Sequence, residues 1–303
     1  MMYLPWRASG ARLQLPRDLE IAYAVGRMGL VTIADTYPLW YGSCHTCRFG
    51  FGRLTRLGLL RSLPRPNVIS PAWFSLTNRG LEWTAEQAGC DERELRTVAS
   101  IRDLNKAALS SRNRFWTSLA LSCRRSPDIR IEYFRPEWEL RPLRQEHVHV
   151  VPDALLGLAR QEVTGVRRCG WMVEVDNTTE RTAVWKSKAA QYAALRSAGR
   201  LYGTADWRLL ALVPSARRAH SVAVAVTAGG AGAFSFVALT KSLEDGKAFD
   251  HALWQCLELA KASEAPPTRC LVDRLSKPID KADQRQRSMV DRDLPSKNGA
   301  ISR

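Results

Sequence analysis

Apolar residues in the first part of the chain recur at three- and four-residue steps, a spacing that predicts amphipathic helices. Asp18 can cap the first of these helices, and Gly29 ends it. A short second helix is expected over 34–39, and a third runs from a cap at Ser43 to Leu57. The N-terminal part is therefore predicted to begin with three helices.

Two short strand-like runs follow the third helix. The first covers 59–63, a turn covers 64–67, and the return strand covers 72–76. Thr77 and the residues up to Gly80 then open a fourth helix. This pattern predicts a β-hairpin packed between two helices.

Two strings resemble the joints of a winged helix-turn-helix domain. Leu54–Leu60 has the form LxxxGLL between recognition helix and wing, and Phe74–Gly80 resembles the YxLTxxG exit from the wing. Together with the order of helices and hairpin, they predict a winged helix-turn-helix DNA-binding domain over residues 1–90. A winged helix that binds protein rather than DNA is the alternative.

The expected DNA contacts lie on the third helix and the hairpin. A recognition helix lies in the major groove, with short polar and arginine side chains on its outer face. Arg48 can reach a guanine edge or a phosphate, and the other arginines are placed for phosphates. The predicted set is Thr46, Arg48, Arg53, Arg56, Arg61 and Arg65. The alternative is that these arginines only solvate a surface.

The pattern changes after the hairpin region. A long helical stretch is expected over 91–123, and strands and helices then alternate from 129 to about 259. The apolar stretch 221–239 is predicted to form buried strands joined by a turn at Gly229-Gly230. The predicted organisation after the first domain is a linking helical region over 91–125, a second domain over 126–262 and a disordered polar tail over 263–303.

Acidic residues stand near the apolar ends of two strand-like strings in the second domain. The first string, 147–156, contains Pro152-Asp153, and the second, 171–176, contains Glu174 and Asp176. This pattern resembles the PD-(D/E)xK nuclease superfamily, which holds a divalent cation, usually Mg²⁺, between carboxylates of adjacent strands. The alternative is that Asp153 caps a turn and the later acids form a solvated loop.

The resemblance implies roles for particular residues. Asp153 and Glu174 would be the ligands of Mg²⁺, which would activate water for phosphodiester cleavage. The superfamily normally has lysine where this chain has Asp176, so Lys188 on the following helix is the candidate replacement. Lys188 shares a helical face with Tyr192, whereas Lys186 lies on the opposite side. The implied catalytic set is Asp153, Glu174, Asp176 and Lys188.

A narrower resemblance covers nearly the whole chain. A winged helix, a long linking helix and the order PD…EVD…E…K…Y resemble the replication-relaxation family of plasmids and mobile elements. The matching residues are Pro152, Asp153, Glu174, Val175, Asp176, Glu180, Lys188 and Tyr192. This family is linked to plasmid replication and to relaxation of plasmid DNA, which implies double-stranded DNA as a partner.

Charge and composition agree with such a partner. The 303 residues carry 45 Lys and Arg against 30 Asp and Glu, a net charge of +15 that favours a polyanion such as nucleic acid. There is no apolar run long enough to span a membrane. The seven cysteines stand at irregular spacings, which predicts reduced thiols and a cytoplasmic protein.

The expected fold class is α+β, with an N-terminal winged helix-turn-helix followed by an α/β PD-(D/E)xK nuclease-like core. The main functional hypothesis is a DNA-binding protein of a plasmid or mobile element that regulates or processes DNA. A Mg²⁺-dependent endonuclease or nickase is the second hypothesis. A dimeric transcriptional repressor with a catalytically inactive nuclease-like domain is the third.

Overall fold

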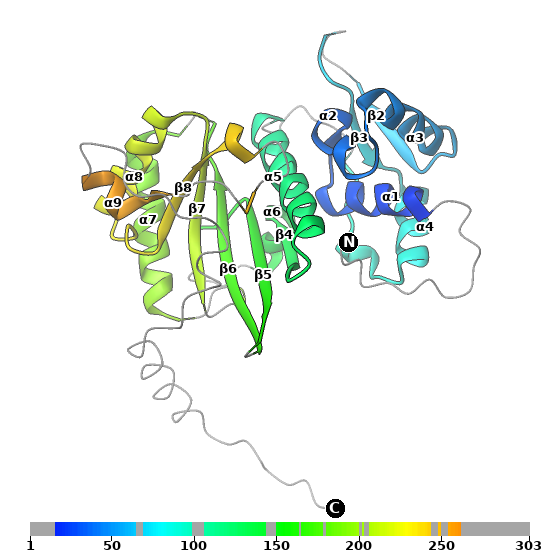
Figure 1. The fold of residues 1–303 in the computed structure, drawn as a ribbon. Helices are drawn as coiled ribbons and strands as arrows, with labels where there is room; N and C mark the ends of the chain where they lie inside the picture. The colour runs from blue at the N-terminus through cyan, green and yellow to red at the C-terminus, as the bar shows by residue number, and fades with distance from the viewer. Residues whose placement is uncertain are drawn as a thin grey trace, which may run out of the picture.

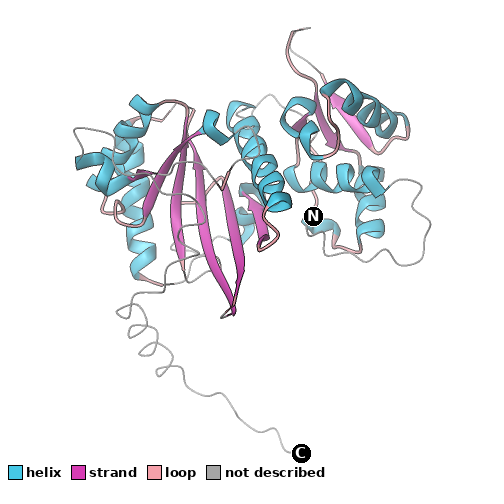
Figure 2. Ribbon diagram, in the orientation of Figure 1, coloured by secondary structure: helices cyan, strands magenta, loops and turns pink. Residues whose placement is uncertain are grey.

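The computed structural model describes residues 16–64, 69–98, 106–143, 150–163, 165–177, 180–199, 202, 206–243, 248–249 and 254–261. The fold is a mixture of helices and two sheets, as the α+β expectation requires (Figures 1 and 2). The predicted disordered tail over 263–303 and the centre of the predicted turn, 65–67, lie outside the described residues.

The first part of the chain forms helices around a three-stranded antiparallel sheet with strand order β1-β3-β2. Its elements are α1 (Pro16–Met28), β1 (Val31–Thr32), α2 (Ile33–Thr36), η1 (Tyr37–Leu39), α3 (Cys44–Arg56), β2 (Leu60–Leu63), β3 (Trp73–Leu76) and α4 (Asn78–Ala88). The predicted helices and both hairpin strands are therefore present, with ends within a few residues of those expected.

Side-chain caps begin α3 and α4. Ser43 accepts a hydrogen bond from the backbone N–H of Thr46, and Thr77 accepts one from that of Gly80. The predicted cap at Asp18 is wrong, because α1 begins at Pro16 and Asp18 lies buried in its first turn.

Two glycines explain why the sequence has the form LxxxGLL before the hairpin and resembles YxLTxxG at its end. Gly58 ends α3 with a φ of 72°, a left-handed conformation that favours glycine. Gly80 packs against the backbone just before β2, where a Cβ atom would come within 1.9 Å of the Leu59 carbonyl oxygen. The two glycines and the Thr77 cap therefore form one joint, in which the Thr77 hydroxyl also donates to the Gly58 carbonyl at 2.6 Å.

The prediction of one long helix over 91–123 is wrong in its first part. The chain forms a short 3-10 helix, η2 (Glu92–Glu94), which ends at Leu95 in extended conformation, and residues 96–98 are not helical. The backbone N–H of Arg96 donates to the carbonyl of Gly26, and that of Val98 donates to the hydroxyl of Ser75. These contacts replace helical hydrogen bonds at both residues, and in the described part of the chain helix α5 runs from Lys106 to Arg125.

The rest of the chain builds a six-stranded sheet with the order β4-β5-β6-β7-β8-β9. Strands β6, β7 and β8 are mutually parallel, and the other neighbours are antiparallel. The elements are β4 (Ile129–Pro136), α6 (Glu137–Leu140), η3 (Arg141–Leu143), β5 (Ala154–Glu162), β6 (Gly165–Val175), α7 (Thr182–Ser197), β7 (Trp207–Val213), α8 (Ala216–Ala228), β8 (Ser235–Leu239), η4 (Thr240–Leu243), β9 (Trp254–Gln255) and α9 (Cys256–Lys261).

Helices cover both faces of this sheet (Figure 1). Helix α5 lies against one face, where Phe115 and Leu119 share a core cluster with Leu210 of β7. Helices α7 and α8 cover the other face, where Trp185 packs with Val213. Because successive residues of a strand point to opposite faces, a single apolar strand such as β7 serves both cores.

The prediction that 221–239 forms two buried strands is wrong. Residues up to Ala228 belong to helix α8, which begins at a Ser215 cap, and only β8 is a strand. The buried residues of α8 (Ala219, Val222, Ala223 and Val226) do recur at three- and four-residue steps, but apolar residues also occupy its exposed side, where Val224 is 41% exposed, so the sequence pattern hides this periodicity. The predicted turn at Gly229-Gly230 is present and joins helix to strand.

Helix α5 joins the two parts of the fold as a shared wall. Buried Arg112 donates to the carbonyl of Met28, and Asn113 donates to that of Leu30. Asp35 of α2 accepts hydrogen bonds from Ser110 at 2.6 Å and from Arg114 at 2.9 Å. The predicted linking region therefore includes a packed structural helix.

Two further expectations concern the whole described chain. No helix within the described ranges is long and apolar enough to cross a membrane. The six cysteines in those ranges are free thiols, as their irregular spacing predicted.

Candidate functional site

The first candidate surface is the outer face of helix α3. The inner face buries Cys47, Gly50, Phe51 and Leu54 in the core, which orients the opposite side toward solvent. His45, Phe49, Gly52 and Arg56 fall within an arc of about 60° on that outer side, and Arg48 flanks it. We call these five residues the α3 outer face.

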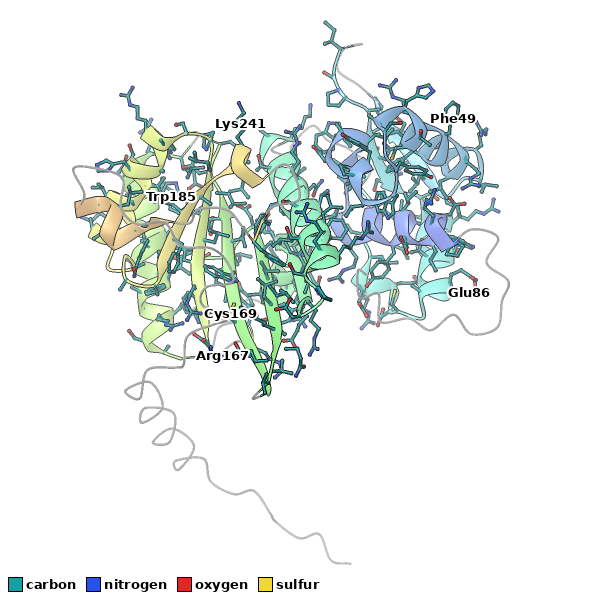
Figure 3. The ribbon with its side chains drawn as sticks, viewed as in Figure 1. Phe49, Glu86, Arg167, Cys169, Trp185 and Lys241 are labelled. Atoms are coloured by element: carbon teal, nitrogen blue, oxygen red, sulfur yellow. The ribbon has the colours of Figure 1, made fainter. Side chains whose placement is uncertain are left out.

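The α3 outer face is basic and partly aromatic. Arg48 and Arg56 are exposed, and neither has a hydrogen-bond or ion-pair partner among the residues described. Phe49 is 65% exposed, and its ring meets that of His45 edge-on at 5.1 Å. Figure 3 shows Phe49 on the side of α3 that faces away from the six-stranded sheet.

The other predicted DNA contacts have different surroundings. Thr46 is exposed in the first turn of α3, where its hydroxyl lies 2.9 Å from that of Ser43. Arg53 forms an ion pair at 2.5 Å with buried Asp18, which favours a structural role for that arginine. Arg61 is only half-exposed, and its Nε atom is buried. Arg65 lies outside the described residues.

The second candidate site lies where strand β5 begins and strand β6 ends. Pairing of Ala154 with Val173 brings Asp153 beside Glu174, at one edge of the sheet. The prediction that Asp153 stands within a strand is wrong, because β5 begins only at Ala154. The sheet nevertheless brings the expected carboxylates together. We call Asp153, Glu174, Asp176 and Glu180 the acidic cluster.

Glu174 is bound by two donors from helix α7. The Lys188 ammonium lies 2.9 Å from its Oε2 atom, and the Tyr192 hydroxyl donates to its Oε1 atom at 2.7 Å. Burial raises the pKa of Glu174, while the Lys188 charge opposes that rise. Lys188 also contacts Glu180 at 2.6 Å. Burial alone would lower the pKa of Lys188, but Glu174 and Glu180 outweigh that effect and raise the pKa above its ordinary value. Lys188 is therefore a charged partner of the cluster.

Asp176 holds a different pair of helices. Its Oδ2 atom accepts hydrogen bonds from the indole N–H of Trp185 at 2.8 Å and from Arg218 of α8 at 2.6 Å. The side chain is fully buried in these contacts. Figure 3 shows Trp185 on the α7 side of the sheet, with Arg167 toward the other end of β6. Asp176 thus connects α7 and α8 to the end of β6 through hydrogen bonds.

Asp153 is linked to the same strand end through the backbone. Its Oδ2 atom accepts a hydrogen bond from the backbone N–H of Val175 at 2.7 Å. Burial raises its pKa, an effect that this hydrogen bond and the charge of Lys188 oppose. Its direct partner is therefore Val175, whereas Lys188 contacts Glu174 and Glu180.

The net charge of the acidic cluster bears on whether the cluster could hold a metal ion. Its four carboxylates face two bonded cations, Lys188 and Arg218, among the described residues. The Oε2 atom of Glu180 is buried without a hydrogen-bond partner in the same part of the chain. Carboxylates are the ligands that a divalent cation prefers, but no group of three or more His, Cys, Asp or Glu side chains in the described ranges is arranged to hold one, and the Lys188 ammonium contacts both Glu174 and Glu180.

The sequence did not lead us to predict several of the contacts in this site. Glu180 lies before α7 and Lys188 lies within it, eight residues later, so helical spacing does not predict their ion pair. The contacts of Trp185 and Arg218 with Asp176 depend on how α8 packs. The basic pair Arg217-Arg218 after a strand was the one local signal for the second contact.

Comparison with known proteins gives one match. The profile of the family described as replication-relaxation matches residues 39–206, more than half of the chain. Comparison with curated proteins and with solved structures gives no match. The matched range includes the α3 outer face and the acidic cluster, and it ends before Arg218.

Proposed function

The chain belongs to the replication-relaxation family, and from this premise we propose that it binds double-stranded DNA in the replication or relaxation of a plasmid or mobile element. The α3 outer face would recognise the duplex. The second part of the chain would position or process the DNA that the first part holds.

The single observation that carries this proposal is the composition of helix α3. Its 13 residues include three arginines and no acidic residue, and Arg48 and Arg56 are exposed without partners in the described part of the chain. The helix precedes a hairpin, β2–β3, in the order of a winged helix-turn-helix, whose recognition helix enters the major groove. Unpaired arginines on such a helix suit phosphates and guanine edges.

The salt dependence of duplex affinity tests this proposal. Each phosphate contact that is lost should reduce the slope of log affinity against log salt by about 1. Arg48→Ala combined with Arg56→Ala should therefore weaken binding and reduce the slope by up to about 2. Arg53 is left intact because its ion pair with Asp18 stabilises the fold.

A control with the same charge change separates this effect from net charge. Arg167 and Arg168 lie in β6 toward its other end from the acidic cluster, and each is ion-paired, to Glu162 and Glu132 respectively. Replacing both with alanine should leave the slope nearly unchanged. Equal effects of the two double variants would contradict recognition by α3.

A metal-dependent nuclease is the second candidate function. The order of α5, antiparallel β4–β5–β6, α7 and parallel β7 supports a PD-(D/E)xK-like core. The specific observation in its favour is the negative charge of the acidic cluster, together with a buried Oε2 atom of Glu180 that has no hydrogen-bond partner among the described residues. Asp153 and Glu174 would hold Mg²⁺, which supplies an activated water and charge stabilisation at the phosphate.

Incubation with supercoiled plasmid and Mg²⁺ or Mn²⁺ tests the nuclease proposal. Wild-type protein should produce nicked or linear DNA, and Asp153→Ala and Glu174→Ala should each abolish that product. Nicking that survives both substitutions would exclude the acidic cluster as its source. Absence of nicking would favour a core that only positions DNA.

The dimeric repressor differs from both candidates in stoichiometry. Two copies of the chain would bind a palindromic site with a two-fold axis. Light scattering of the complete chain, together with a footprint on the preferred duplex, distinguishes a symmetric dimer from a single bound copy.

A further inference from the structure

The exposed aromatic ring of Phe49 has no role within the described fold. It lies in the middle of the α3 outer face, 65% exposed, and its one aromatic contact is the edge of His45. On the opposite side of the same helix, Phe51 is fully buried. A single exposed apolar side chain is common on protein surfaces, so Phe49 indicates a partner only together with the residues around it.

Gly52, one turn after Phe49, supplies a second and independent observation. Glycine inside a helix is less favourable than alanine, so its presence needs a reason. Gly50 has one, because a Cβ atom there would lie 2.3 Å from the Tyr41 hydroxyl. Among the described residues, a Cβ atom at Gly52 would meet only the guanidinium of Arg56, at 4.0 Å, and the φ of Gly52 is not in the left-handed region. The fold therefore does not require glycine at 52, whereas a closely approaching partner would.

The charge around these two residues indicates the partner. Exposed Arg48 and Arg56 flank Phe49 and Gly52, and α3 contains no acidic residue. A second copy of the same face would bring these arginines against one another. Duplex DNA is complementary to the arginines, and its major groove is wide enough to admit a helix.

We propose that Phe49 contacts the 5-methyl group of a thymine in the major groove, with Gly52 leaving room for the helix backbone to approach the bases. This inference rests on the proposed binding of duplex DNA and adds a base preference to it. Among the base edges in the major groove, thymine alone presents a methyl group, and phenylalanine is one of the side chains that contact it.

Removal of a single methyl group from the DNA tests the inference. The complete chain first selects its preferred duplex from a randomised library. Each thymine of that duplex is then replaced in turn by deoxyuridine, which lacks only the 5-methyl group. At one position the affinity of wild-type protein should fall roughly fourfold, the value expected for one buried methyl group. Phe49→Ala should bind both duplexes equally.

Val163→Ala is the matched control for loss of an exposed apolar side chain, because Val163 is fully exposed at the turn between β5 and β6. It should retain the full effect of deoxyuridine. If wild-type protein binds duplex DNA but no thymine replacement affects it differently from Phe49→Ala, the contact is wrong while DNA binding stands. If the chain selects no duplex, the proposed function and this inference both fail.

A second variant tests the room at Gly52. Gly52→Ala should raise the midpoint of thermal unfolding by roughly 1–4 °C, because alanine favours the helix. The same variant should bind the selected duplex roughly fivefold or more weakly, because the new methyl group occupies space needed by the DNA. Unchanged affinity would overturn the close approach. A dimer that dissociates on Phe49→Ala would identify a second copy as the partner and overturn the thymine contact.

Discussion

The ion pair between Lys188 and Glu174 allows a quantitative test of the acidic cluster. Lys188→Met removes the ammonium but keeps a side chain of similar length. The Glu174 side chain is only 3% exposed and that of Lys188 is 25% exposed, so water cannot fully replace the lost charge. Removing one partner of a buried ion pair costs about 3–5 kcal/mol of stability. Because Lys188 is partly exposed, we expect its removal to cost about 3 kcal/mol, the lower end of this range.

Thermal unfolding in a chelator measures this loss without a metal. A loss of about 3 kcal/mol should lower the unfolding midpoint by roughly 6–12 °C. The loss should depend on pH, because burial raises the pKa of Glu174 and removal of Lys188 raises it further. A carboxyl group with a raised pKa in the folded state loses stability as pH rises toward that pKa. The destabilisation should therefore be larger at about pH 8 than at about pH 5.

Two further variants decide whether the reasoning is correct. Lys186→Met changes an exposed lysine of the same helix and should have little effect. Glu174→Gln combined with Lys188→Met removes both charges and should recover part of the lost stability. The ion-pair argument is refuted if Lys188→Met is no more destabilising than Lys186→Met, or if the double variant recovers nothing.

Three other substitutions test the surrounding structure. Arg53→Ala should reduce the free energy of unfolding by about 1–3 kcal/mol, since it leaves buried Asp18 unpaired, while the salt slope of DNA binding stays unchanged; a reduced slope would instead assign Arg53 to the DNA. Asp35→Ala should weaken the contact of the first part of the chain with α5, so we expect calorimetry to resolve two unfolding transitions for the variant and one for wild type. Gly80→Ala should cost about 1–3 kcal/mol or more in denaturant unfolding because of the Leu59 carbonyl, and a neutral result would contradict the packing of that joint.

The N-terminal elements could be predicted because local chemistry specifies them. Ser43 and Thr77 cap helices with their own side chains, and Gly58 adopts a backbone conformation that other residues disfavour. Local sequence signals gave a wrong prediction where tertiary packing decides the secondary structure. Leu95 and Val98 have helical spacing, yet neither lies in a helix, and both are buried in core clusters with residues of the N-terminal part.

The second part of the chain shows the same division. Periodicity could not distinguish helix α8 from a strand, because its exposed side also carries apolar residues such as Val224 and Ala228. Strand pairing was predictable enough to bring Asp153 and Glu174 to one edge, and helix spacing placed Lys188 and Tyr192 on one face. The contact of Arg218 with Asp176 joins residues 42 positions apart, so it depends on the packing of α8 against β6.

The central claim is that the outer side of α3 contacts duplex DNA. A photo-cross-linking side chain in place of Thr46, exposed in the first turn of α3, tests it directly on the selected duplex. The same group in place of Val163, at the distant β5–β6 turn, is the reference. The account predicts a DNA cross-link from position 46 and none from position 163. Cross-linking from position 163 alone would contradict recognition by α3.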